Sequence, residues 1–339
     1  MRNKHLHQVL RLFVALVFAG AIAGCGGGGS SGNTSLPGTN SGAVGGTTKN
    51  PGAVPQGGTQ WQVQAGGERL DDALVALAYG PETITIDEGD SITWTDAGEA
   101  HTVTFFGPFN APQAPPPVPV GGPNPSYDGS TYISSGILEP GQTYTVTFSK
   151  AGTYPYVCLF HSPEHRGVVI VQPRGTRYPH PQGYYSGTGT ALLEHLLNDA
   201  MASVSTIPYA VGGTHVAAGV SPPLSNGIPP KSAVFRFLDG NRLNLTSVTI
   251  SVGTTVTWTS LDFTDPHTVT FPIDGQPLPP LDPFSPPIGG STYDGTQLTN
   301  SGVLNEGDSY SLTFTKAGTF KYYCIFHEEQ HMIGTVIVK

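Results

Sequence analysis

The sequence predicts an all-β chain in which two β-sandwich domains follow one another. Apolar and polar residues alternate over short segments, and the 45 glycines and 31 prolines suit many turns. The length of 339 residues allows about two domains. Landmarks also recur at a constant offset of 166 residues, so that the Tyr127-Asp128-Gly129 segment matches Tyr293-Asp294-Gly295. This long period indicates a duplicated domain rather than a solenoid repeat.

The chain begins with a basic segment and a short apolar stretch that ends at Cys25. We expect residues 1–24 to be a signal peptide. The small residues before Cys25 resemble a bacterial lipobox, which implies lipidation of its thiol. An ordinary signal peptide cut nearby and an uncleaved anchor are the alternatives. Residues 25–58 are rich in Gly, Ser, Thr, Asn and Pro and are predicted to be a tether.

The first domain is expected over residues 59–173. Glu88-Gly89-Asp90 separates two segments of period-two alternation, which predicts a pair of antiparallel strands. Further short apolar segments follow at regular spacing. The strands expected after the start near Trp61 are Thr83–Ile86, Ser91–Trp94, His101–Phe105, Tyr144–Phe148, Thr153–Cys158 and Val168–Val171.

Residues 174–213 are predicted to be a linker that contains one helix, at about 190–204. Leu193, Leu197 and Val204 belong to an apolar stripe at helical spacing, which indicates packing onto a domain. His195 and Met201 lie in this segment, and we do not expect either to bind a metal.

The second domain is expected over residues 214–339, with strands that repeat those of the first. Between two of the strands, residues 272–290 are rich in proline and cannot continue a strand ladder. Their counterpart is residues 107–125. These segments are either surface loops without a role or a frame for a docking surface. The expected strands are Val234–Phe237, Val248–Val252, Thr255–Thr259, Thr268–Phe271, Tyr310–Phe314 and Phe320–Cys324.

A Cys-x-x-His motif occurs at the same place in both repeats. Cys324, His327 and Met332 lie in one short loop, and a His-Thr-Val-Thr-Phe segment begins 57 residues before Cys324, at His267. A thiolate, two imidazoles and a weak axial thioether are the ligands of a blue-copper electron-transfer site. One Cys-x-x-His motif alone is a weak signal that also occurs in zinc sites. Its repetition at a fixed distance from His-Thr-Val-Thr-Phe makes copper the favoured metal.

These residues closely resemble the cupredoxin family, the plastocyanin-like proteins with type 1 copper. In that family one histidine follows a strand that bears a tryptophan, here Trp258, and a C-terminal Cys-x-x-His loop that ends in methionine supplies the other ligands. The resemblance implies two Greek-key β-sandwiches in tandem, each with one copper ion. In the second domain it assigns the ligands to His267, Cys324, His327 and Met332.

In the first domain the corresponding residues are His101, Cys158 and His161, and the loop has no methionine. By simple offset Arg166 takes the place of Met332. Alignment on Gly167 and Gly334 instead places His165 opposite Met332, as an axial ligand that would lower the reduction potential. Alternatively, His165 corresponds to a surface residue, His331, and the first site has three ligands or has lost its metal.

The expected function is electron transfer by a membrane-tethered protein at the cell envelope, at the periplasmic or outer-membrane face. The partners would be redox proteins such as a cytochrome or an oxidase, and contact with the membrane would be made through the lipid anchor only. A net charge of −9 argues against nucleic-acid binding. An alternative is copper handling without redox turnover. A multicopper oxidase or a nitrite reductase is less favoured, because no histidine adjoins Cys158 or Cys324.

Overall fold

The structure is a computed structural model, and it describes residues 58–69, 73–108, 115–116, 118–161, 164–207, 213–240, 247–279, 286–328 and 330–339. The predicted signal peptide, Cys25 and nearly all of the tether lie outside these residues. In the described part of the chain no helix is both long and apolar enough to cross a membrane.

Domain 1 contains strands β1 to β10, and the alternation of buried and exposed residues along several of them reflects the sequence pattern. In β8, for example, Tyr144, Val146 and Phe148 point into the core while their neighbours are more exposed. The strands are β1 (Gln60–Arg69), β2 (Leu74–Gly80), β3 (Thr83–Asp87), β4 (Ser91–Asp96), β5 (Thr104–Phe105), β6 (Ser126–Tyr127), β7 (Ile133–Ser134), β8 (Thr143–Phe148), β9 (Gly152–Val157) and β10 (Arg166–Gln172).

Domain 2 repeats this order with strands β11 to β20. Trp258 in β14 is fully buried, as is Trp94 at the same place in domain 1. The strands are β11 (His215–Val220), β12 (Ser232–Leu238), β13 (Ser247–Ile250), β14 (Thr255–Leu261), β15 (Thr270–Phe271), β16 (Thr292–Tyr293), β17 (Thr299–Asn300), β18 (Ser309–Phe314), β19 (Gly318–Tyr323) and β20 (Ile333–Val338).

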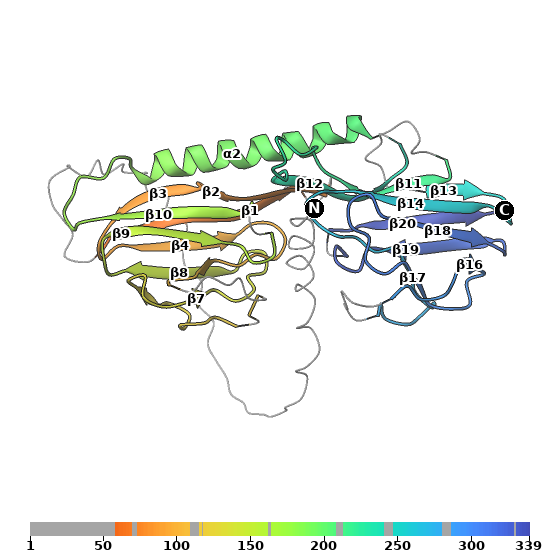
Figure 1. The fold of residues 1–339 in the computed structure, drawn as a ribbon, viewed down its shortest axis with the longest axis horizontal. Coiled ribbons are helices and arrows are strands. Elements are labelled where there is room, and N and C mark those ends of the chain that lie inside the picture. Colours follow the sequence, from red (N-terminus) through yellow and green to blue (C-terminus); the bar gives the residue numbers. More distant parts are fainter. Residues whose placement is uncertain are drawn as a thin grey trace, which may run out of the picture.

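The strands form two sandwiches that share one sheet (Figure 1). A ten-stranded sheet has the order β16-β18-β14-β11-β12-β2-β1-β4-β8-β6, so half of it belongs to each domain. The order β3-β10-β9-β5-β7 makes the second layer of domain 1, and β13-β20-β19-β15-β17 makes that of domain 2. The predicted all-β fold with tandem sandwiches is confirmed, whereas the shared sheet was not foreseen. The antiparallel pair predicted across Glu88-Gly89-Asp90 is wrong, because β3 pairs with β10 and β4 pairs with β1 and β8 in the other sheet.

The junction between the domains is the antiparallel pair β2–β12, in which Val75 lies opposite Ala233. Side chains of β2 alternate between two cores. Leu74 and Ala76 pack beneath the helix, while Val75 and Leu77 belong to the apolar core of domain 2. A strand of the first domain therefore completes the core of the second.

Helix α2 (Gln182–Ser203) continues into a single 3-10 turn, η2 (Val204–Thr206). It lies over β1 and β2 of domain 1 and reaches β12 at the junction, rather than forming a free spacer (Figure 1). Leu193 and Leu197 pack against residues of β2 and β12. The helix begins at Gln182, earlier than the predicted start near 190. The Gly-rich first turns are weak helix formers, but Tyr185 is buried in the core of domain 1 and supports them.

Candidate metal centres

Each predicted ligand lies where a strand ends at the interdomain side of its sandwich. Cys158 follows β9 directly, and Cys324 follows β19 directly. The first histidine of each repeat, His101 or His267, is held by paired backbone hydrogen bonds, with Leu138 and Leu304 respectively. The loops after the two cysteines bring the remaining candidates back toward the thiols. We call the cluster in domain 1 centre 1 and the cluster in domain 2 centre 2.

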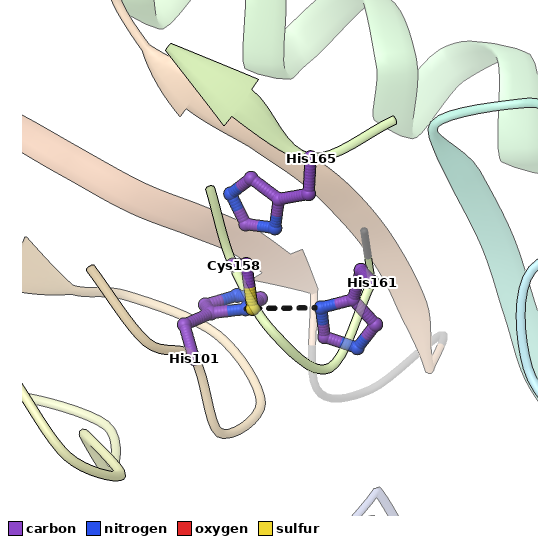
Figure 2. A group of neighbouring side chains, drawn as sticks. All are labelled: His101, Cys158, His161 and His165. Atoms are coloured by element: carbon purple, nitrogen blue, oxygen red, sulfur yellow. Dashed lines mark hydrogen bonds between the residues drawn. The ribbon is translucent and has the colours of Figure 1, made fainter. Parts of the chain in front are cut away.

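Centre 1 contains His101, Cys158, His161 and His165, whose ligand atoms all lie within 4.8 Å of one another (Figure 2). The Sγ of Cys158 is 3.5 Å from Nδ1 of His161 and 3.9 Å from Nδ1 of His101. The backbone N–H of Thr102 donates to the same sulfur at 3.4 Å. The side chains that face this sulfur are buried.

His165 is fully buried beside the rings of His101 and Tyr79, at centroid distances of 4.7 and 4.2 Å. Neither ring nitrogen has a well-formed hydrogen bond in the described part of the chain, although the backbone of Ala78 lies nearby. Burial, and then the neighbouring histidines and Lys231, hold its pKa well below the ordinary value. A neutral imidazole with an unused lone pair is the state that a metal ligand requires.

Centre 2 contains His267, Cys324, His327 and Met332. The Sγ of Cys324 is 3.4 Å from Nδ1 of His327 and 3.8 Å from Nδ1 of His267, and these two nitrogens are 3.1 Å apart. Met332 is fully buried in the same apolar cluster as Cys324. The geometry around the thiol thus repeats that of centre 1 within 0.1 Å for both sulfur–nitrogen distances.

Buried carboxylates fix the histidine rings. Oδ2 of Asp262 lies 3.1 Å from Nε2 of His267, so Nε2–H donates to it and Nδ1 is turned toward Cys324. Burial opposes protonation of His267, but Asp262 and Cys324 outweigh it and raise its pKa to about 10. The pKa of His327 is held well below its ordinary value by burial, then by His267 and His161.

In centre 1 the carboxylate partner sits on a different histidine. Oε1 of Glu99 lies 3.1 Å from Nε2 of His161. Burial disfavours the charged ring, but Glu99, then Asp265 and Cys158 raise the pKa of His161 well above its ordinary value. Asp96, the counterpart of Asp262, does not reach a ring and accepts the backbone N–H groups of Gly98 and His101.

Two glycines that the sequence did not single out make room for the first histidine of each centre. Gly66 and Gly219 lie at β-bulges with φ values of 68° and 73°. A Cβ at Gly66 would lie 1.9 Å from Nε2 of His101, and one at Gly219 would lie 2.0 Å from Nε2 of His267. A bare backbone is needed at both positions. The sequence does not show where a β-bulge falls, so the role of these two glycines becomes visible only in the structure.

The structure brings seven of the eight predicted ligands into two clusters, buries Met332 in the apolar core that contains Cys324, and leaves the other candidates apart. His195 faces Asp199 on the exposed side of α2, His180 stacks on Tyr184, and His215 is exposed. His331 is exposed at φ 56°, so it is not the counterpart of the buried His165. The lipidation site predicted at Cys25 lies outside the described residues.

The donor sets suit copper. A thiolate and two imidazoles select copper or zinc, and the buried Met332 favours copper because a thioether is a poor zinc ligand. In centre 1 the buried His165 places a ring nitrogen within 4.8 Å of the other candidate ligand atoms.

Comparison with known proteins identifies relatives that bind copper, in agreement with the donor sets. The model of the copper-binding plastocyanin/azurin family matches residues 69–172 and 241–339. The chloroplastic plastocyanin of Tetradesmus obliquus is 36% identical over 99 residues, which cover 29% of this chain and 60% of that protein. The plastocyanin of Scenedesmus fuscus is 35% identical over 99 residues, 29% of this chain and 89% of that protein.

Among solved structures, a purple cupredoxin from Nitrosopumilus maritimus is 27% identical, with 37% of this chain and 99% of that chain covered and a TM-score of 0.23. An oxidised amicyanin variant is 23% identical, with 33% and 82% covered and a TM-score of 0.23.

Proposed function

Because the chain belongs to the plastocyanin/azurin family of copper-binding proteins, we propose that it is an electron carrier with one copper ion in each domain. The observation that carries this proposal is the pair of buried Cys-His-His clusters with nearly equal sulfur–nitrogen distances. The proposed ligands are His101, Cys158, His161 and His165 in centre 1 and His267, Cys324, His327 and Met332 in centre 2.

A bound copper ion would supply a one-electron couple between Cu(I) and Cu(II). The chain's own part is to hold the ligands in one arrangement for both oxidation states. Backbone pairing at His101 and His267 fixes the first ligand, the carboxylate of Asp262 orients the His267 ring through Nε2, and Glu99 makes an ion-pair contact with Nε2 of His161. The Thr102 and Thr268 N–H groups, each 3.4 Å from its sulfur, stabilise the thiolate charge. Burial keeps water from the sulfur atoms.

The place of action in this proposal is the cell envelope. It rests on the leader and on the small residues before Cys25, which support lipidation and a tether to the membrane. The exchange partners would be soluble or membrane-bound redox proteins such as a cytochrome or an oxidase. The role is that of a carrier and not of an enzyme.

The test is the visible absorption spectrum of a copper-loaded form without residues 1–25, together with a count of copper per chain. We expect an intense thiolate-to-copper band and about two coppers per chain. Cys158→Ser and Cys324→Ser should each remove one copper and part of the band, and they serve as matched controls for one another. A protein that stays colourless under oxidant would overturn electron transfer and leave copper handling in its place.

A further inference from the structure

His161 reaches from centre 1 to the second domain. Its Nδ1 lies 3.5 Å from the Sγ of Cys158, while its Nε2 points the other way, 3.1 Å from Oε1 of Glu99 and 3.9 Å from Oδ1 of Asp265. Glu99 belongs to domain 1 and Asp265 to domain 2. The side chains of all three residues are at most 13% exposed. A single imidazole ring therefore connects the first thiol to a residue of the other domain.

Asp265 is itself part of the loop that carries centre 2. It precedes His267 by two residues, and Nδ1 of His267 lies 3.8 Å from the Sγ of Cys324. The sequence of contacts from one centre to the other is the His161 ring, a gap of 3.9 Å, the Asp265 side chain and then covalent bonds through Pro266 to His267.

The two domains hold this contact in a fixed geometry. Pairing of β2 with β12 joins them by backbone hydrogen bonds, and Leu77 of domain 1 lies in the core of domain 2. An ion pair between Lys231 and Glu82 adds a further link across the junction. The covering helix α2 packs on strands from both sides. The approach of His161 to Asp265 is therefore built into the fold.

We propose that the His161–Asp265 contact is the route by which one electron passes between the two metal centres of the same chain. This inference rests on the proposed function, because it requires copper in both centres. The transfer oxidises Cu(I) to Cu(II) at the donor centre and reduces Cu(II) to Cu(I) at the acceptor centre, and no bond forms or breaks. An external redox protein supplies the electron to the first centre, and another removes it from the second.

The ligands give the transfer a direction. His165 offers centre 1 an imidazole where centre 2 has the thioether of Met332, and nitrogen stabilises Cu(II) more than a thioether does. Centre 1 therefore has the lower reduction potential, and the electron runs from centre 1 to centre 2. Asp265 acts as a positioning residue in this route, since it contacts a ligand of centre 1 and is not among the proposed copper ligands.

Glu99 provides the matched control. It contacts the same nitrogen of His161 and corresponds to Asp265 by the repeat offset of 166. Unlike Asp265, it belongs to domain 1 and has no covalent connection through its loop to centre 2. Removal of Glu99 perturbs the ring as removal of Asp265 does, while only Asp265 lies on the path to centre 2. The two substitutions therefore separate an effect on the ligand from an effect on the route.

The experiment is pulse-radiolytic reduction of the doubly copper-loaded chain by less than one electron per molecule. Re-equilibration between the two thiolate bands is then followed at several protein concentrations. We expect a concentration-independent phase that slows several-fold in Asp265→Ala. It should be unchanged in Asp265→Asn, which keeps the contact. In Glu99→Ala the rate should change only as far as the measured potential of centre 1 shifts. Dipolar coupling between the two Cu(II) ions in pulsed electron paramagnetic resonance should be the same in all four proteins.

Three results would overturn the inference. The first is an undiminished rate in Asp265→Ala, or an equal loss in Asp265→Asn. The second is the absence of any concentration-independent phase although both bands are present, which leaves the proposed function intact. The third is a further metal ion bound by Glu99, His161 and Asp265 in the fully loaded chain. Absence of the bands themselves would instead overturn the proposed function together with the route.

Discussion

His165 and Met332 occupy the same place in the two repeats. The backbone N–H of Cys158 donates to the carbonyl oxygen of His165 at 2.9 Å, and that of Cys324 donates to the carbonyl oxygen of Met332 at 3.0 Å. The N–H groups of both residues in turn donate to the carbonyl of the loop histidine, His161 or His327. The loop of domain 1 is one residue shorter. The difference lies between the loop histidine and this position, since His165 follows His161 by four residues and Met332 follows His327 by five.

Exchange of the two side chains should exchange the potentials of the centres. We expect His165→Met to raise the reduction potential of centre 1 and Met332→His to lower that of centre 2, because a thioether stabilises Cu(II) less than an imidazole does. Each shift should be at least about 59 mV, a tenfold change in the one-electron equilibrium. Redox titration of the separate absorption bands measures this. Unchanged potentials would show that neither side chain interacts with the metal.

A methyl group at Gly219 should displace His267 from centre 2. The added Cβ of Gly219→Ala would meet Nε2 at 2.0 Å, and the φ of 73° disfavours any side chain. We expect a loss of about 1–3 kcal/mol in unfolding free energy and weaker copper binding at this centre alone. Gly253→Ala is the control, since Gly253 has φ 87° and open space around it. If both variants bound copper equally well, the close approach would have no role.

Leu77→Ala should destabilise domain 2 although Leu77 belongs to a strand of domain 1. Its side chain is 2% exposed within the core of domain 2, and truncation of such a leucine costs about 2–5 kcal/mol. Hydrogen exchange of the metal-free chain should show loss of protection in β14 and β19. Ile84→Ala removes side-chain volume from the core of domain 1 and is the comparison. If hydrogen-exchange protection in domain 2 were the same in Leu77→Ala as in the unmodified protein, the domains would fold independently.

Asp96 should make the metal-free chain less stable as the pH rises. Burial raises its pKa from 3.8 to about 8, against the effect of the N–H groups of Gly98 and His101. The folded state then holds a proton that the unfolded state releases. This contribution is present below pH 4 and is lost as the pH rises to about 8. Denaturant titrations should show a flatter pH dependence in Asp96→Asn.

The control for that slope is Asp128→Asn. The pKa of Asp128 is lowered by the hydroxyl and backbone N–H of Ser130, so this carboxyl is ionised throughout the window from pH 5 to 8. The variant should therefore keep the slope of the unmodified protein over this range. If the unfolding free energy of Asp96→Asn varied with pH as steeply as that of the unmodified protein, groups other than Asp96 would cause the pH dependence.

The candidate ligands could be selected from the sequence because their chemistry is local and the repeat doubles the signal. Cys324, His327 and Met332 lie in one loop, and the fixed distance to His267 recurs in domain 1. The equivalence of His165 with Met332 needed the structure, since a loop that is one residue shorter leaves two alignments possible. Backbone hydrogen bonds decide between them, and these are absent from any sequence pattern.

Strand β2 shows why the junction was missed. Leu74-Val75-Ala76-Leu77-Ala78 is a continuous apolar run without alternation, which does not distinguish a strand from a buried helix. All seven residues of β2 are buried because one face packs under α2 and the other fills the sandwich cores. A strand covered on both sides by parts distant in sequence cannot be identified from its own periodicity.

The β2–β12 pair has the form of a twofold contact between like subunits. Leu74 pairs with Val234 and Ala76 with Ser232, on either side of the central Val75–Ala233 pair. Such self-complementary contacts are typical of homodimers, and a strand left unpaired at a sheet edge templates association with other chains. Either domain produced alone would expose this edge and should pair with a second copy of itself. The duplicated chain is in this sense a covalent dimer, whose two halves have been free to acquire different axial residues.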